Sequence, residues 1–141
     1  MTGAAADAPL LVVDGANVVG SVPDGWWRDR RGAAERLRDA LAPLAATGLA
    51  ADSGAPPWAC GQPLDIVLVV EGAARGVDPV PGVRVESAPG SGDDTITEVA
   101  AHSRITHPDR PCLVITADRE LRTRVTEVGA AVIGPRAVRP R

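Results

Sequence analysis

The sequence predicts an α/β fold with a mostly parallel central sheet of about five strands. Three runs rich in Val, Leu and Ile, at residues 10–13, 64–70 and 112–116, are typical of parallel strands that are buried on both faces. Segments with apolar residues at helical spacing lie between these runs, so strands and helices alternate along the chain. Right-handed crossovers would then place the strand ends at one common edge, with helices covering both faces of the sheet.

The N-terminal half is expected to contain one long helix and several irregular segments. Residues 1–8 are expected to form a disordered leader, and residues 15–25 a turn after the first strand. A helix is predicted from Arg28, because Ala and Leu recur at three- and four-residue steps, and Pro43 should end or kink it. Residues 46–63 are rich in Ala, Gly, Pro and Ser without periodicity. We interpret them as a surface loop insertion, with a lid over the functional site as the alternative.

The C-terminal half is expected to supply the remaining strands and two further helices. Ser91 and Asp94 have the spacing of a capping box at the start of the second helix. The third helix is expected to begin at Asp118 as its N-cap and to stop at Gly129. The predicted strands of this half lie at 83–86, 112–116 and 130–133.

Composition narrows the function classes of this single domain, which is expected to span residues 9–135 ahead of an Arg/Pro tail at 136–141. All fifteen basic residues are Arg, so a phosphate-binding P-loop, which requires a Lys, is excluded. Cys60 and Cys112 form no CxxC motif, which argues against a zinc ribbon or a disulfide framework. The N-terminus lacks the basic start of a signal peptide, and no apolar run approaches the length of a membrane span. A cytoplasmic protein with no membrane partner is therefore expected.

Acidic residues follow three of the predicted strands, at Asp14, Glu71 and Asp118. Two more, Asp93 and Asp94, open the predicted second helix. Because parallel strands end at one edge of a sheet, these carboxylates are expected to converge there, where they repel each other unless a cation binds. Oxygen ligands without Cys or His suit Mg²⁺ or Mn²⁺. Taken singly, each acid is also explained as a helix cap or a turn residue.

Three segments carry a resemblance to a known family: Val13-Asp14-Gly15-Ala16-Asn17-Val18-Val19-Gly20, Gly92-Asp93-Asp94-Thr95-Ile96 and Thr116-Ala117-Asp118. They resemble the YacP-like NYN domain family, which belongs to the PIN-like nucleases. The resemblance implies a PIN-like three-layer α/β/α fold and endoribonuclease activity that depends on Mg²⁺ or Mn²⁺. It also implies that Asp14, Asp93 and Asp118 are the principal catalytic, metal-binding acids. Asn17 would orient Asp14 or a water molecule, and Glu71 and Asp94 would be supporting metal-binding acids.

An acidic site that acts on RNA needs positive charge nearby to hold the phosphate backbone. Two Arg clusters are candidates: Arg28, Arg30 and Arg31 at the start of the first helix, and Arg119, Arg122 and Arg124 beside Asp118. Solvated helix faces are the alternative interpretation of both clusters. Trp26 and Trp27 would stack on unpaired bases if their rings were exposed, or anchor the helix to the sheet if they were buried.

The leading hypothesis is therefore a metal-dependent endoribonuclease that hydrolyses RNA phosphodiester bonds, with ribosome-associated mRNA among its candidate partners. A catalytically weak RNA- or ribosome-binding adaptor of the same fold is the first alternative. A nucleotide phosphohydrolase is the second, and the missing Gly-rich Lys loop counts against it. No catalytic role is expected for His102 or His107, because water activated by a bound metal needs no general-base His. Nothing in the sequence indicates an oligomeric state.

Overall fold

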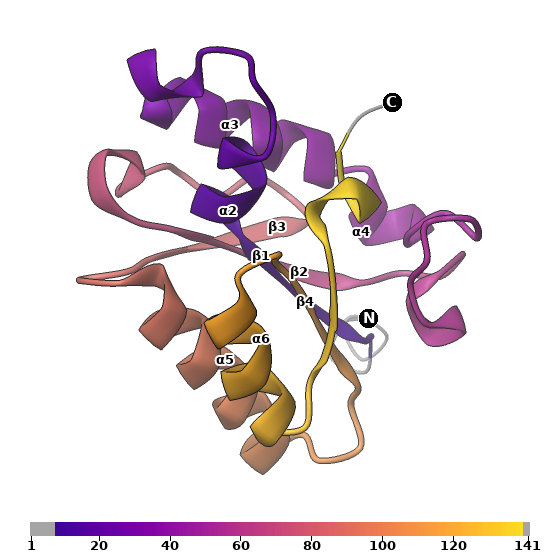
Figure 1. Ribbon diagram of the computed structural model, residues 1–141. Helices are drawn as coiled ribbons and strands as arrows, with labels where there is room; N and C mark the ends of the chain where they lie inside the picture. Colours follow the sequence, from indigo (N-terminus) through magenta and orange to yellow (C-terminus); the bar gives the residue numbers. More distant parts are fainter. Residues whose placement is uncertain (1–7, 140–141) are drawn as a thin grey trace.

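The computed structural model describes residues 8–139, and a five-stranded sheet with parallel neighbours throughout lies at its centre (Figure 1). The order of the strands is β3-β2-β1-β4-β5. The strands are β1 (Leu10–Asp14), β2 (Asp65–Val70), β3 (Val83–Ser87), β4 (Cys112–Ile115) and β5 (Ala131–Ile133). The predicted α/β class and parallel sheet are confirmed.

Helices cover both faces of the sheet and complete the three layers (Figure 1). The α-helices are α2 (Gly15–Gly20), α3 (Arg30–Leu41), α4 (Leu44–Thr47), α5 (Gly92–Thr106) and α6 (Arg119–Glu127). Four short 3-10 helices join them: η1 (Trp26–Arg28), η2 (Pro57–Ala59), η3 (Gly72–Ala74) and η4 (Pro135–Ala137). Within residues 8–139, no helix combines the length and apolar character that crossing a membrane requires.

Strand β1 supplies the centre of both core layers because successive side chains point to opposite faces of a strand. Leu11 and Val13 pack in the cluster beneath α2, α3 and α4, whereas Leu10 and Val12 pack beneath α5 and α6. All four side chains are buried, and each stabilises the fold by roughly 1.5–3 kcal/mol. The continuous apolar run that predicted this strand thus reflects burial on both faces.

The order of the strands has a switch point between β1 and β4, because strands are added first on one side of β1 and then on the other. The chain builds β1, β2 and β3 outward on one side, and then returns to pair β4 with the other side of β1. In open parallel sheets such a switch point opens a crevice beyond the carboxyl ends of the strands, where ligands bind. Asp14 is the last residue of β1 and lies at this point.

Residues 15–20 form helix α2, so the turn predicted for 15–25 is wrong over its first half. Asp14 caps this helix by accepting a 3.3 Å hydrogen bond from the Asn17 N–H, and Val18 is buried in the core. Gly15 is required at the first position, because a Cβ there would lie 2.6 Å from the backbone oxygen of Val69. Two glycines and two valines in six residues have low helix propensity, so tertiary contacts rather than local preference stabilise α2.

The segment 46–63 is only partly the surface insertion that its composition predicted. Leu49 and Ala59 are buried in the core, and the Leu49 N–H donates a 2.9 Å hydrogen bond to the carbonyl of Ala59. A single parallel bridge joins Leu49 to Cys60. Two small apolar residues at the ends of an irregular stretch carry no periodic signal, although they fix the loop to the domain.

The packed part of the chain extends beyond both predicted boundaries. Ala8, placed by prediction in the disordered leader, is 7% exposed, while residues 1–7 lie outside the described range. At the other end, η4 and the buried Val138 belong to the core rather than to a free Arg/Pro tail. The rest of that predicted tail, residues 140–141, lies outside the described range.

The predicted ends of α6, with Asp118 as N-cap and Gly129 as stop, are confirmed, whereas the predictions for the starts of α3 and α5 need correction. The first long helix begins at Arg30 instead of Arg28, because Asp29 caps it through the Gly32 N–H. Ser91 caps α5 through the Asp93 N–H at 3.2 Å, while the Asp94 carboxylate pairs with Arg124 and so does not complete a capping box. The stop of α6 at Gly129 is confirmed by its positive φ of 90°.

Candidate functional site

Three strand ends meet at the switch point and bring distant residues together. β1 lies between β2 and β4, with Val13 opposite both Leu68 and Ile115. Asp14 therefore emerges between the segment that follows β2, which begins with Glu71, and the segment that follows β4, which leads to Asp118. The parallel sheet alone accounts for this convergence.

Asp14 is the most buried carboxylate of the site, with 4% of its surface exposed. Its Oδ2 accepts a 2.8 Å hydrogen bond from Thr116 Oγ1, and its Oδ1 accepts the capping bond from the Asn17 N–H. Burial raises the pKa of Asp14 from 3.8 to about 6, against the opposing effect of these two hydrogen bonds; Asp93 and Glu71 add to the rise. Burial at this site thus raises the free energy of the ionised form of Asp14.

The segment after β4 is held against α2 by a second set of bonds. The Ala117 N–H donates a 2.8 Å hydrogen bond to Asn17 Oδ1, and the Asp118 N–H donates to Thr116 Oγ1 at 3.1 Å. Asp118 Oδ1 in turn accepts from the Leu121 N–H at 2.9 Å and caps α6. Asn17 therefore orients Asp14 through its backbone, while its side chain fixes the loop that carries Asp118.

Glu71 and Asp93 form the other half of the acidic cluster. A Cβ on Gly92 would lie 2.7 Å from Glu71 Oε1, so the Glu71 carboxylate lies against the start of α5 and would have to shift if residue 92 carried a side chain. The pKa of Asp93 is raised, first by burial and then by the charges of Asp118 and Glu71, while Arg124 opposes the rise. Electrostatic repulsion thus links Asp14, Glu71, Asp93 and Asp118 into one group.

Asp94 differs from the other four predicted acids. Its side chain is 67% exposed and forms a 3.0 Å ion pair with Arg124 of α6, which joins the two helices on that face. Within residues 8–139, no three His, Cys, Asp or Glu side chains lie close enough together to hold one metal ion. The four carboxylates therefore interact electrostatically, but they do not form a preformed set of metal ligands.

Two residues of the site were not singled out in the sequence. Thr116 is fully buried and contacts both Asp14 and Asp118, and a hydroxyl residue at the end of an apolar strand was a readable signal for this role. Glu120, in the first turn of α6, also raises the pKa of Asp93. No periodic or motif signal distinguished Glu120 from an ordinary helix-start acid.

The two neighbouring tryptophans lie at the start of α3, and neither ring is buried. Trp27 is 55% exposed, and Trp26 is partly covered beside Gly20 at the end of α2. The rings meet edge to face at 6.1 Å. The guanidinium of Arg28 lies 5.8 Å from the centre of the Trp27 ring, and that of Arg30 lies 5.3 Å from the centre of the Trp26 ring. Cation–π contacts of this kind hold exposed rings in place.

The remaining predicted RNA-binding arginines divide into two kinds. Arg31 donates to the carbonyls of Arg75 and Gly76, so it ties the start of α3 to the loop beyond Glu71. Arg119 and Arg122 are exposed on α6, directly after Asp118. The contact made by Arg31 places the tryptophan segment at the same sheet edge as the acids.

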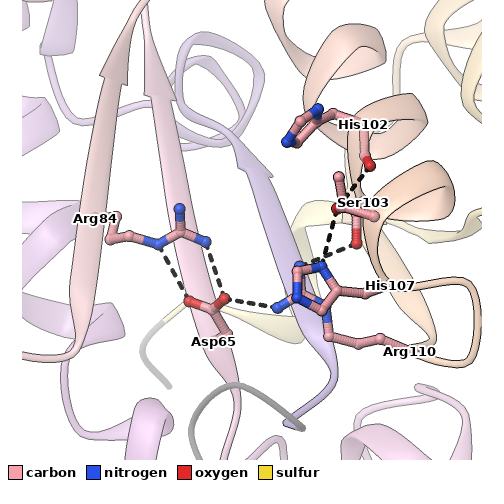
Figure 2. Close-up of polar contacts among 7 residues, drawn as sticks. Asp65, Arg84, His102, Ser103, His107 and Arg110 are labelled. Atoms are coloured by element: carbon pink, nitrogen blue, oxygen red, sulfur yellow. Dashed lines mark hydrogen bonds and ion pairs between the residues drawn. The ribbon is translucent and has the colours of Figure 1, made fainter. Parts of the chain in front are cut away.

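A separate polar cluster occupies the opposite edge of the sheet (Figure 2). Asp65, at the start of β2, pairs with Arg84 at 2.9 Å and with Arg110 at 3.0 Å, and Arg110 also donates to Ser103 of α5. Figure 2 shows His102 and His107 on this side, near the end of α5. Both histidines therefore lie away from the acidic cluster.

Comparisons with known proteins bear on the fold. No family model matches the chain, and no curated protein matches it. Among solved structures, the chain is similar to a point mutant of Rae1 (YacP) from Bacillus subtilis, with a TM-score of 0.64 and 19% sequence identity. The similarity covers 92% of this chain and 72% of that chain. The resemblance that the sequence motifs suggested is confirmed for the fold.

Proposed function

From a YacP-like fold with four coupled carboxylates at its switch point, we propose that the chain is a divalent-metal-dependent endoribonuclease that hydrolyses RNA phosphodiester bonds. The observation that carries the proposal is the buried Asp14, whose pKa is raised to about 6 at the centre of a group that includes Glu71 and Asp93. Strongly shifted carboxylates in a crevice are typical of functional sites. The family resemblance of the motifs that contain these residues supplies the reaction class.

The chemistry of the donors fits Mg²⁺ or Mn²⁺. The group offers carboxylate oxygens without Cys or His, and such oxygens are the ligands that these hard cations prefer. Asp14, Asp93 and Asp118 would be the principal ligands, with Glu71 in support. When bound, the metal would lower the pKa of a water molecule and stabilise the leaving oxygen of the phosphodiester.

The residues around the acids would keep them in position and hold the substrate. Thr116 and the Asn17 N–H orient the two oxygens of Asp14, and the cap of α6 uses only Oδ1 of Asp118. Arg28, Arg30, Arg119 and Arg122 would attract phosphates, and the exposed Trp27 would stack on an unpaired base. Single-stranded regions of RNA are therefore the proposed substrate, and mRNA on the ribosome is a candidate source of them.

Cleavage assays with single-stranded and structured RNA test this proposal. We expect cleavage with Mn²⁺ or Mg²⁺, none with EDTA, and a loss of at least about a hundredfold in Asp14→Asn and Asp118→Asn. Asp94→Asn is the matched control, because its carboxylate is already paired with Arg124. Products should carry 3′-hydroxyl and 5′-phosphate ends. Activity that survives chelation and both substitutions would contradict the metal mechanism.

A non-catalytic RNA-binding adaptor of the same fold is the second candidate. It is favoured by one observation: Asp14 and Asp118 each cap a helix, a role that both carboxylates would keep without catalysis. An adaptor would bind RNA equally well as the parent chain, as Asp14→Asn and as Asp118→Asn, with no turnover under any metal. The same assays therefore separate the two functions.

A further inference from the structure

A large pocket lies on the face of the sheet that α2 and α3 cover, and α2 forms part of its lining. Its volume is about 1090 Å³. Val18 and Val19 of α2 and Leu37 of α3 give it an apolar floor, and residues 52–54 and the C-terminal segment complete its walls. This α2–α3 pocket is large enough for several flat or apolar groups, since ligand pockets span roughly 300–1,000 Å³.

Three arginines from distant parts of the sequence line the α2–α3 pocket. Arg36 comes from α3, and Arg136 and Arg139 come from the C-terminal segment. Arg139 is held in place by a 3.1 Å hydrogen bond from its Nη1 to the carbonyl of Ser21. Arg36 and Arg136 are exposed, and neither guanidinium donates a hydrogen bond to another residue of the range 8–139.

The charge balance of the pocket departs from that of the whole chain. Three Arg and the two acids Asp24 and Asp52 line it, so it is positive in a protein whose formal net charge is −3. An apolar floor beneath arginines matches a ligand that has flat apolar parts and negative charges. A nucleotide with its base unpaired has both features, whereas a base within a duplex has its faces covered by stacking.

Helix α2 connects this pocket directly to the acidic cluster. Asp14 caps the N-terminus of α2, and Val18 and Val19 in its second half line the pocket. At 1.5 Å per residue, the floor begins about 6–8 Å along the helix from the carboxylate. Helix α2 therefore sets a short separation between the acidic cluster and the pocket.

We propose that the α2–α3 pocket binds the single-stranded RNA that flanks the phosphodiester bond at the acidic cluster. Arg36 and Arg136 contact phosphates, Arg139 closes the wall, and the partly exposed Val19 contacts a base or ribose. The proposal rests on the proposed endoribonuclease function, and it assigns the substrate strand a path that the acidic residues alone do not define. Arginine suits this role because its fork of N–H donors matches a phosphate.

Equilibrium binding of unstructured RNA oligonucleotides, measured in EDTA at several salt concentrations, tests the pocket. We expect Arg36→Ala and Arg136→Ala each to weaken binding about tenfold, as loss of a charged hydrogen bond implies. The double variant should lower the slope of log affinity against log salt by about 1.4, because each phosphate contact on a single strand contributes about 0.7. The effect should disappear for oligonucleotides too short to reach the pocket.

Arg104→Ala is the charge-matched control, because Arg104 is exposed on α5 beside residues 108–112, away from the α2–α3 pocket. It should change binding less than about twofold. Ala40→Phe, which narrows the pocket without removing charge, should weaken binding by long oligonucleotides only. Thermal unfolding verifies that each variant is folded.

The outcomes separate this proposal from the proposed function. If the parent chain cleaves RNA while both single variants, the double variant and Ala40→Phe bind it unchanged, the pocket serves another ligand and the proposal is overturned. If no metal supports cleavage but the arginine variants still weaken RNA binding, the pocket is an RNA-binding site as proposed, while the nuclease function fails. Equal weakening by Arg104→Ala would also overturn the pocket assignment, because it would indicate only a loss of overall charge.

Discussion

Thr116 Oγ1 donates a 2.8 Å hydrogen bond to Asp14 Oδ2, although the two residues are 102 positions apart in the sequence. The same hydroxyl accepts from the Asp118 N–H, so one buried side chain positions two acids that come from neighbouring strands. Because β1 and β4 are in register at Val13 and Ile115, the next residues of the two strands meet at the switch point. The parallel pairing of β1 and β4 therefore makes possible a hydrogen bond that orients a candidate metal-binding acid.

Replacing Thr116 with Val should destabilise the domain and impair the site. The substitution keeps the shape of the side chain but removes the donor to Asp14, and a buried polar group without its partner costs about 1–3 kcal/mol. The pKa of Asp14 should rise further, since the Thr116 bond lowers it. Urea unfolding at neutral pH measures the loss of stability, and Thr116→Ser, which keeps the hydroxyl, should restore most of it. Equal stability of the Val and Ser variants would show that the hydrogen bond contributes little.

Asp14→Asn should become more stable relative to the parent chain as the pH rises from acidic to neutral. Asp14 has an ordinary pKa of 3.8 and a folded pKa of about 6, so the folded state holds its proton more tightly. Its contribution to stability is fully present below pH 3.8 and is lost as the pH rises through 6, a loss of about 3 kcal/mol. The Asn side chain does not titrate in this range, so the variant does not undergo this loss of stability.

Unfolding of the parent and of Asp14→Asn in EDTA, at pH values from 3.5 to 7.5 on either side of the two pKa values, measures this difference. The free energy of unfolding of the variant minus that of the parent should increase with pH, and most steeply between about 4 and 6. A difference that does not change with pH would contradict the raised pKa of Asp14.

Added Mg²⁺ or Mn²⁺ should raise the melting temperature of the parent chain. A ligand that binds only the folded state stabilises it by RT ln(1 + [L]/Kd), or about 2.7 kcal/mol at a hundred times Kd. The gain should vanish in Asp93→Asn and persist in Asp94→Asn, because Asp93 is repelled by Asp118 and Glu71 whereas Asp94 is paired with Arg124. Equal gains in both variants would place the metal elsewhere.

Trp27→Ala should weaken binding of single-stranded RNA with little change in stability. Stacking of a base on an aromatic ring contributes about 1–3 kcal/mol, and Trp27 is the more exposed of the two rings. Trp26→Ala should instead lower the melting temperature, since its ring packs between Gly20 and the guanidinium of Arg30. Fluorescence anisotropy and thermal unfolding distinguish these effects, and a reversal of the two phenotypes would contradict the assignment.

Asp65→Asn should destabilise the domain and leave RNA cleavage per folded molecule unchanged. It removes the partner of Arg110, whose side chain is 11% exposed and whose Nε has no hydrogen-bond partner within residues 8–139. Breaking such a partly buried pair costs about 1–3 kcal/mol. Asp39→Asn, whose carboxylate is 64% exposed in its pair with Arg38, should cost less than 1 kcal/mol. Chemical denaturation compares the two, and equal losses would argue against the role of burial.

The secondary structure was predicted best where apolar patterns are long. Continuous apolar runs were sufficient to place the buried strands, and apolar residues at helical spacing were sufficient to place helices α3, α5 and α6. Helix α2 was missed because Gly15 and the valines are poor helix formers, and tertiary features such as the burial of Val18 and the Asn17–Ala117 hydrogen bond stabilise it. The burial of Leu49 and Val138 was missed for a different reason: isolated apolar residues have no periodicity.

The sequence by itself determined which acids meet. Asp14, Glu71 and Asp118 follow buried parallel strands, and the common direction of those strands brings the three to one edge whatever the details of packing. Local sequence patterns are sufficient for this prediction because each acid directly follows, or ends, a strand that its own apolar run identifies.

Only the tertiary structure decided what each polar residue contacts. It separated Asp93, repelled by Asp118 and Glu71, from its neighbour Asp94, paired with Arg124. It also gave Thr116 its two partners and assembled Arg36 with Arg136 and Arg139 around the α2–α3 pocket. The physical reason is that hydrogen bonds and ion pairs act over a few ångströms between residues from distant parts of the chain, so their partners depend on packing and not on local sequence.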